Sequence, residues 1–201
     1  MPGFTPVESI GLLQQPRVAL ELSHAARRTR GLEQELPYIY SGYKGRLHAL
    51  HRLRAVRSMA MEQTIVADLI CGEAASGRAV GLTSAFVNAP TVENKPDLKL
   101  SPSAVEVSYW HLNSNIEDDA LSIGTRAVQH IADQAMKHLN GAEPNQDAWM
   151  VTLPNDVDKE GVCEELGFRR VDHLASFVDA DDGVRVPRYL WRVPLGNLIE
   201  S

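Results

Sequence analysis

The sequence predicts one α/β domain, built on a mixed, mostly antiparallel central sheet that is flanked by helices. Three observations support this prediction. Two β-branched runs, at 65–71 and 79–87, are joined by a short turn of Gly, Ala and Ser, which is typical of a hairpin. Apolar runs typical of strands alternate with helical periodicity from residue 105 to residue 168. A closing antiparallel pair follows at 168–178 and 186–193, around the turn Asp179-Ala180-Asp181-Asp182-Gly183.

The N-terminal third of the chain differs in pattern from the remainder. Residues 1–61 are predicted to be a helical N-terminal part of the same domain, and residues 62–201 its core. Between residues 14 and 36 apolar residues recur among charges, and no glycine or proline occurs from Arg17 to Arg30. This pattern favours a helix or a helix pair.

The alternation in the second half of the chain has recognisable boundaries. Three prolines in the segment 89–104 predict a long loop, because proline cannot donate to a strand ladder. In the last predicted helix, Gly167 favours a left-handed C-terminal end, and Asp156 or Asp158 favours an N-cap. The expected elements are a strand over 105–112, a helix over 123–139, a strand over 148–153 and a helix that begins after Asp156 or Asp158 and ends at Leu166-Gly167.

Composition limits the class of protein. With 201 residues and 44% hydrophobic content, the chain can bury one substantial core, and nothing suggests disorder or low complexity. No apolar run approaches the length of a membrane span, and the sequence that opens with Met1-Pro2-Gly3 lacks a signal-peptide pattern, so we expect a cytoplasmic protein without a membrane partner. Cys71 and Cys163 lack neighbours at metal-ligand spacing, which predicts two free thiols and no metal site.

The net charge of −6 is unevenly spread. Residues 1–60 hold nine basic and four acidic residues, a net of +5, whereas the remaining eleven basic and twenty-two acidic residues give −11. A basic region can contact nucleic acid or the ribosome, or it can be the solvated face of a helix. We favour the solvated face, because no aromatic residues are interleaved with Arg27, Arg28 and Arg30.

Four short sequence segments occur in order in the second half of the chain: Glu106–Trp110, Ser122–Val128, Trp149–Asn155 and Glu165–Arg169. In this order they resemble the acyl-CoA N-acyltransferase fold of the GCN5-related N-acetyltransferases (GNAT), especially the branch that acetylates protein N-termini and small amines. The resemblance covers residues 62 to 194. It implies an acetyltransferase-like core with acetyl-CoA as co-substrate and a primary amine, on a small molecule or a protein N-terminus, as acceptor.

The resemblance also implies where acetyl-CoA binds. In the family the fourth and fifth strands splay apart, and their unpaired backbone groups bind the pantetheine arm as an added strand would. The loop before the long helix offers backbone N–H groups to the pyrophosphate. Asn155 matches a pantetheine contact, although it can equally be a turn residue after proline. The implied cofactor-binding residues are Trp110, His111, Leu112, Ser122, Ile123, Gly124, Thr125 and Asn155.

The pyrophosphate loop departs from the family pattern, which is Gln or Arg, two residues, Gly, one residue, then Gly or Ala. The matching stretch is residues 119–124, where only Gly124 fits and Ser122 replaces a glycine. The carboxylates of Glu117–Asp119 would place negative charge near the pyrophosphate. These departures favour an alternative function, a non-catalytic binding or regulatory module with the acetyltransferase fold.

The resemblance implies two catalytic residues. Glu106 matches a strand carboxylate that takes a proton from the amine, and its alternative role is structural. Cys163, five residues before Phe168, occupies the place of a Tyr that protonates the departing CoA thiolate in many relatives. We favour the alternative for Cys163, a small core filler, because helical Cys residues usually pack in the core. His111 is a weaker candidate base.

Overall fold

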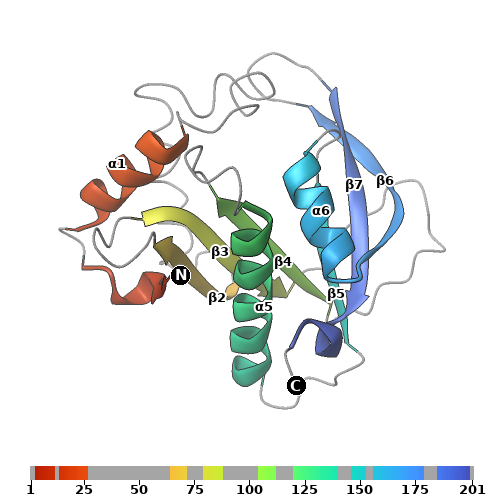
Figure 1. Cartoon of the computed structure of the whole chain (residues 1–201), viewed down its shortest axis with the longest axis horizontal. Helices are drawn as coiled ribbons and strands as arrows, with labels where there is room; N and C mark the ends of the chain where they lie inside the picture. The colour runs from red at the N-terminus through yellow and green to blue at the C-terminus, as the bar shows by residue number, and fades with distance from the viewer. Residues whose placement is uncertain are drawn as a thin grey trace.

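A computed structural model describes residues 3–11, 14–26, 64–71, 79–87, 104–111, 120–139, 146–152, 156–178 and 185–199. In these ranges a seven-stranded sheet has the order β1-β2-β3-β4-β5-β7-β6 (Figure 1). The strands are β1 Gly3–Pro6, β2 Thr64–Cys71, β3 Ala79–Val87, β4 Val105–His111, β5 Asp147–Thr152, β6 Arg169–Val178 and β7 Arg185–Pro194. The helices are α1 Gln15–Ala26, α5 Ala120–His138 and α6 Val157–Glu165, with short 3-10 turns η1 Val7–Ser9 and η2 Leu195–Leu198.

The sheet is mixed and mostly antiparallel, which confirms the predicted fold class. The β4–β5 pair is parallel, and every other neighbouring pair is antiparallel. Parallel neighbours need a long crossover, and α5 lies in the connection between β4 and β5. In Figure 1, α5 (green) lies across β2, β3 and β4, and α6 (cyan) lies beside it next to β5.

One strand was not predicted. β1 is a four-residue edge strand that ends at Pro6 and pairs with β2, with Phe4 opposite Ile70. It has too few residues to show an alternating pattern, so no strand could be predicted there. The predicted N-terminal helix is confirmed over α1, which lies against β3. Arg27, Arg28 and Arg30, and the predicted loop 89–104 except for its last residue, lie outside the described residues.

The helix α5 buries one face against the sheet. Ala127 and Ile131 are among its fully buried residues, and they pack in one cluster with Val105 and Val107 of β4. The buried residues recur at helical spacing, as the sequence predicted. The hydroxyl of Thr83 in β3 lies within hydrogen-bond distance of two carbonyl oxygens, that of Ser108 in β4 at 3.1 Å and that of Ala127 in α5 at 3.2 Å, and so links the helix to the sheet.

The helix α6 has both of the ends that the sequence predicted. The Asp156 side chain accepts a hydrogen bond from the backbone N–H of Lys159, 3.3 Å away, and so caps the N-terminus. Gly167 has a φ of 73°, the left-handed conformation that favours glycine at a helix C-terminus. The N–H of Phe168 closes that end on the carbonyl of Cys163 at 2.8 Å.

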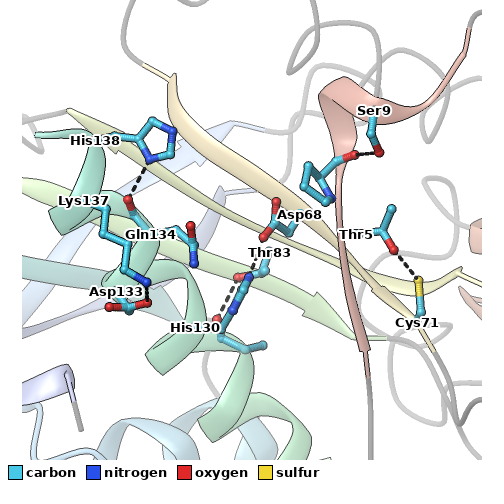
Figure 2. A network of polar contacts seen from close by, with 12 residues as sticks. Thr5, Ser9, Asp68, Cys71, Thr83, His130, Asp133, Gln134, Lys137 and His138 are labelled. Carbon is cyan, nitrogen blue, oxygen red and sulfur yellow. Dashed lines mark hydrogen bonds and ion pairs between the residues drawn. The ribbon is translucent and has the colours of Figure 1, made fainter. Parts of the chain in front are cut away.

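A polar contact joins α5 to the edge of the sheet away from α6. His130 Nε2 and the buried Asp68 Oδ2 are 2.5 Å apart (Figure 2), and the ring of Phe4 stacks on His130 with centroids 4.0 Å apart. Thr5 of β1 also contacts Cys71 at the end of β2, with Oγ1 and Sγ 3.6 Å apart. The short edge strand is therefore held by side chains as well as by its ladder.

No helix within the described ranges combines the length and the apolar character that a bilayer crossing requires.

Candidate functional site

The parallel pair β4–β5 is joined only at its beginning. Beyond this start, β4 stays paired with β3 as far as His111, and β5 stays paired with β7 as far as Thr152. The two strands are thus held by their outer neighbours and do not pair with each other along their second halves. The residues that do pair are Val105 with Ala148 and Glu106 with Trp149. This is the splayed pair that the resemblance implied, and its vertex lies at Glu106 and Trp149.

The two faces of β4 at this gap differ in chemistry. Val105, Val107 and Tyr109 belong to the core cluster under α5. Side chains alternate along a strand, so Glu106 and Ser108 lie on the opposite face. Both are half-buried. The candidate base is therefore on the sheet face away from α5, at the point where the gap begins.

The start of α5 requires a correction to the predicted boundary. The sequence placed the end of the pyrophosphate loop near Ile123, whereas α5 begins at Ala120. Ser122 lies in the first turn, whose backbone N–H groups have no partner within a helix. Ile123, Gly124 and Thr125 lie inside the helix, where backbone N–H groups bond to the preceding turn. The apolar periodicity begins at Ile123 because the first turn faces solvent, and this exposure explains the error.

Two of these residues have distinct environments. The Ile123 side chain is buried in the core cluster. The Thr125 hydroxyl oxygen is buried and has no hydrogen-bond partner in the described part of the chain. A buried polar group without a partner is unfavourable, which makes this hydroxyl a candidate for binding a ligand.

Gly124 allows α5 to approach both α6 and β4. A Cβ at this position would lie 2.7 Å from Val162 Cγ2 and 2.8 Å from Tyr109 Oη. Both distances are too short for a side chain, so only glycine fits without a shift of its neighbours. The glycine that matched the family pattern thus has a packing role here.

Tyr109 was not singled out by the sequence, and it lies beside Gly124 between the two helices and the sheet. Its side chain is 5% exposed, and burial raises the pKa of the Tyr109 phenol well above its ordinary range, with the Asp156 carboxylate adding to the effect. The ammonium of Lys159 lies 5.8 Å from the ring centroid. The phenol therefore stays neutral. The close approach of Tyr109 to Gly124 joins residues far apart in the sequence, so no local pattern could have indicated it.

Cys163 is fully buried in the same core cluster. Burial raises the pKa of its thiol, and the nearby Lys159 ammonium only partly opposes this shift. A proton-donating residue must reach the leaving group, and a thiol without exposed surface has poor access. This environment favours the core-filler interpretation of Cys163.

Four implied cofactor contacts belong to the end of β4 or to the residues that follow β4 and β5 in the sequence. Leu112 and Asn155 lie outside the described residues. For Trp110 and His111 the structure describes the backbone, which forms the last part of β4 along the gap.

Comparisons with known proteins identify the fold. No family model matches the sequence, and no curated protein matches it. Among solved structures, RimJ from Mycobacterium smegmatis in complex with CoA-disulfide is similar with a TM-score of 0.61 and 16% identity over 96% of this chain and 81% of that chain. Ribosomal-protein-S5-alanine acetyltransferase from Vibrio fischeri gives a TM-score of 0.57 and 15% identity over 89% and 88%. A phosphinothricin acetyltransferase from Sinorhizobium meliloti in complex with AcCoA gives 0.59 and 11% over 97% and 89%.

These similarities show that the chain has the GNAT acyl-CoA N-acyltransferase-like fold, as the resemblance indicated. At this level of identity, they identify the fold alone.

Proposed function

We propose that this chain transfers an acetyl group from acetyl-CoA to a primary amine by direct attack in a ternary complex. The observation that carries the proposal is the gap between β4 and β5, which pair at only two positions. Beyond Glu106 and Trp149, the described parts of the two strands, Val107–His111 and Met150–Thr152, have no register partners in each other. A pantetheine arm is extended and carries amide groups, so it can bind to such strand edges as an added strand would.

The start of α5 supports a position for the pyrophosphate. Phosphate oxygens are favoured at a helix N-terminus, where free N–H groups and the helix dipole both attract negative charge. Ser122 would supply a first-turn N–H group, and the unpartnered Thr125 hydroxyl could donate to a phosphate oxygen. Trp110, His111 and Leu112 would bind the pantetheine arm through their backbone, with Asn155 at its side.

Glu106 is the proposed general base. Bound acetyl-CoA supplies a thioester carbonyl carbon, and a protonated amine must lose a proton before it can attack that carbon. Glu106 lies at the vertex of the gap, on the sheet face away from α5, and is half-buried, so it is placed to accept that proton. The new C–N bond forms as the C–S bond breaks; of the two protons left on the nitrogen, one stays in the amide and the other passes to the CoA sulfur. Backbone N–H groups near Trp110–Leu112 would stabilise the negative charge on the carbonyl oxygen.

The proposal does not require Cys163 as an acid. A thiol has an ordinary pKa near ~8.5, so a thiolate is an adequate leaving group near neutral pH without a protein donor. We therefore assign Cys163 to packing.

The acceptor amine is proposed to be a small molecule or a protein N-terminus. The similar solved structures include enzymes named for each type, phosphinothricin and a ribosomal-protein alanine.

If the basic N-terminal region presents the chain to a ribosome, RNA binding should weaken with salt and disappear when Arg27, Arg28 and Arg30 are neutralised.

A second function, a non-catalytic binding or regulatory module, has specific support. Glu117–Asp119, which lie outside the described residues, precede α5 in the sequence, and their carboxylates would oppose a pyrophosphate bound at the start of this helix. The buried Cys163 stands where many relatives carry a Tyr acid.

Calorimetry with acetyl-CoA on the full chain separates the two functions. The enzyme proposal predicts micromolar affinity, followed by CoA release when an amine acceptor is added. Absence of heat at millimolar acetyl-CoA would contradict the proposal and favour the non-catalytic module. Binding without CoA release across amines of both classes would favour that module as well.

A further inference from the structure

Two aromatic residues stand beside the candidate base in the sheet. Phe86 of β3 is the register partner of Glu106 in β4, and Glu106 is in turn the register partner of Trp149 in β5. Register partners project to the same face of a sheet, and neighbouring strands lie about 5 Å apart. The three side chains therefore form a continuous row across three strands, with the carboxylate in the middle. We call Phe86, Glu106 and Trp149 the ammonium row.

The three members of the ammonium row differ in burial. Trp149 is 3% exposed and packs with Ala104 and Leu190, so its indole is held by neighbouring side chains. Glu106 and Phe86 are only half-buried. Phe86 also belongs to neither of the apolar clusters in the described part of the chain. Glu106 and Phe86 therefore each retain some exposed surface.

A carboxylate between aromatic rings matches one chemical class of ligand. An ammonium ion can pair with the carboxylate while its remaining N–H and C–H groups lie against the electron-rich ring faces. These contacts replace part of the hydration that the cation loses on entering the site. A neutral molecule of the same shape would gain only the apolar contact.

We infer that the ammonium row binds the acceptor in its protonated form, with Phe86 and Trp149 as positioning residues on either side of Glu106. The acceptor class is then an amine that is cationic at neutral pH and sits at the end of an apolar stem. This inference rests on the proposed acetyl transfer, since it supplies the step before deprotonation. Because Glu106 and Trp149 form the last rung before the gap opens, an ammonium bound there lies next to the proposed thioester position.

A binding experiment without acetyl-CoA tests the ammonium row directly. The full chain is titrated with n-butylammonium chloride and, in parallel, with neutral 1-pentanol, which has a similar size. The readout is the NMR signal of the Trp149 indole N–H, assigned with Trp149→Phe among the three Trp residues of the chain. We expect a saturable shift at millimolar n-butylammonium and a much smaller response to 1-pentanol.

Two variants and one control assign the effect to the row. Phe86→Leu keeps apolar bulk but removes the ring face, which should weaken n-butylammonium binding about two- to fivefold. Glu106→Gln removes the charge and should weaken binding by about tenfold or more. Phe4→Leu is the matched control: Phe4 is also half-buried but stacks on His130, and binding should not change.

The inference is overturned if n-butylammonium gives no saturable shift at Trp149, or if 1-pentanol binds equally well. Unchanged affinity in Glu106→Gln would also overturn it, and this variant keeps the test decisive if Phe86→Leu does not fold. Acetyl-CoA calorimetry is independent of this titration. Loss of acetyl-CoA binding with intact ammonium binding would reject the proposed function alone, whereas the reverse result would reject the ammonium row alone.

Discussion

The two faces of β4 show how one strand serves both stability and a site. On the face under α5, Val105, Val107 and Tyr109 are buried in a closely packed core. On the opposite face, Glu106 and Ser108 are half-buried polar residues. The difference comes from alternation along the strand, which lets the packed face hold the strand while the other presents reactive groups. Substitutions on the two faces should therefore affect different measurements.

The largest effect is expected on the face of β4 away from α5. Glu106→Gln preserves size but removes the proton acceptor, so turnover at neutral pH should fall by about 10²- to 10⁴-fold. Acetyl-CoA affinity from calorimetry should stay within twofold, because the carboxylate acts on the amine. An unchanged rate would remove Glu106 from its proposed role, and a parallel loss of affinity would make it a cofactor-site residue instead.

On the packed face, Gly124→Ala should destabilise the fold. Its Cβ would lie within 3 Å of both Val162 and Tyr109, and such overpacking typically costs about 1–3 kcal/mol. Urea denaturation measures the loss. Gly161→Ala in α6 is the control, because its Cβ would meet only Leu121 at an ordinary 3.4 Å and alanine favours a helix. Equal effects of the two variants would show that the close approach at Gly124 is not limiting.

Substitutions of Thr125 in α5 and of Thr83, which contacts α5 from β3, should affect different measurements. The Thr125 hydroxyl has no partner in the described ranges, whereas that of Thr83 has the carbonyl oxygens of Ser108 and Ala127 as acceptors. Thr125→Val should lower acetyl-CoA affinity about tenfold without loss of stability, because it removes a donor to phosphate. Thr83→Val should lower stability without changing affinity. Calorimetry and denaturation on both variants check this pairing, and unchanged affinity in Thr125→Val would exclude the phosphate contact.

Tyr109 gives the smallest effect, visible only at alkaline pH. Burial raises its pKa in the folded state, so the stability that it contributes is complete below its unfolded pKa of about 10 and is lost as the pH rises above that value. Tyr109→Phe should therefore flatten the alkaline decline of the free energy of unfolding, while Tyr189→Phe on β7 controls for the lost phenol. The same alkaline slope in wild type and Tyr109→Phe would contradict the buried, neutral phenol.

What the sequence could predict depended on local pattern. The α6 cap at Asp156 and the turn at Gly167 follow from single residues with strong local preferences, and α5 follows from its periodicity. β1 is too short to show alternation, and the first turn of α5 exposes Leu121, so neither produced a signal. These limits concern elements that contribute little apolar burial.

The site was predictable only in part, because it depends on register. The resemblance located Glu106 and the splayed strands, and the partial β4–β5 pairing agrees with it. The juxtaposition of Phe86 with Glu106 depends on how β3 and β4 align, and the contact of Tyr109 with Gly124 depends on how α5 packs. A one-residue shift of strand register or of helix packing would change both contacts, and the sequence of no single segment determines how it aligns with its neighbour.

Hydrogen exchange along β4 and β5 tests the gap most directly. In the free protein, amides of Val107–His111 and Met150–Thr152 that point into the gap should exchange faster than those paired with β3 and β7, and acetyl-CoA should slow them selectively. Uniform protection of both segments in the free protein, unchanged by acetyl-CoA, would mean that the strands are joined along their length, and it would contradict the proposed binding of the pantetheine arm.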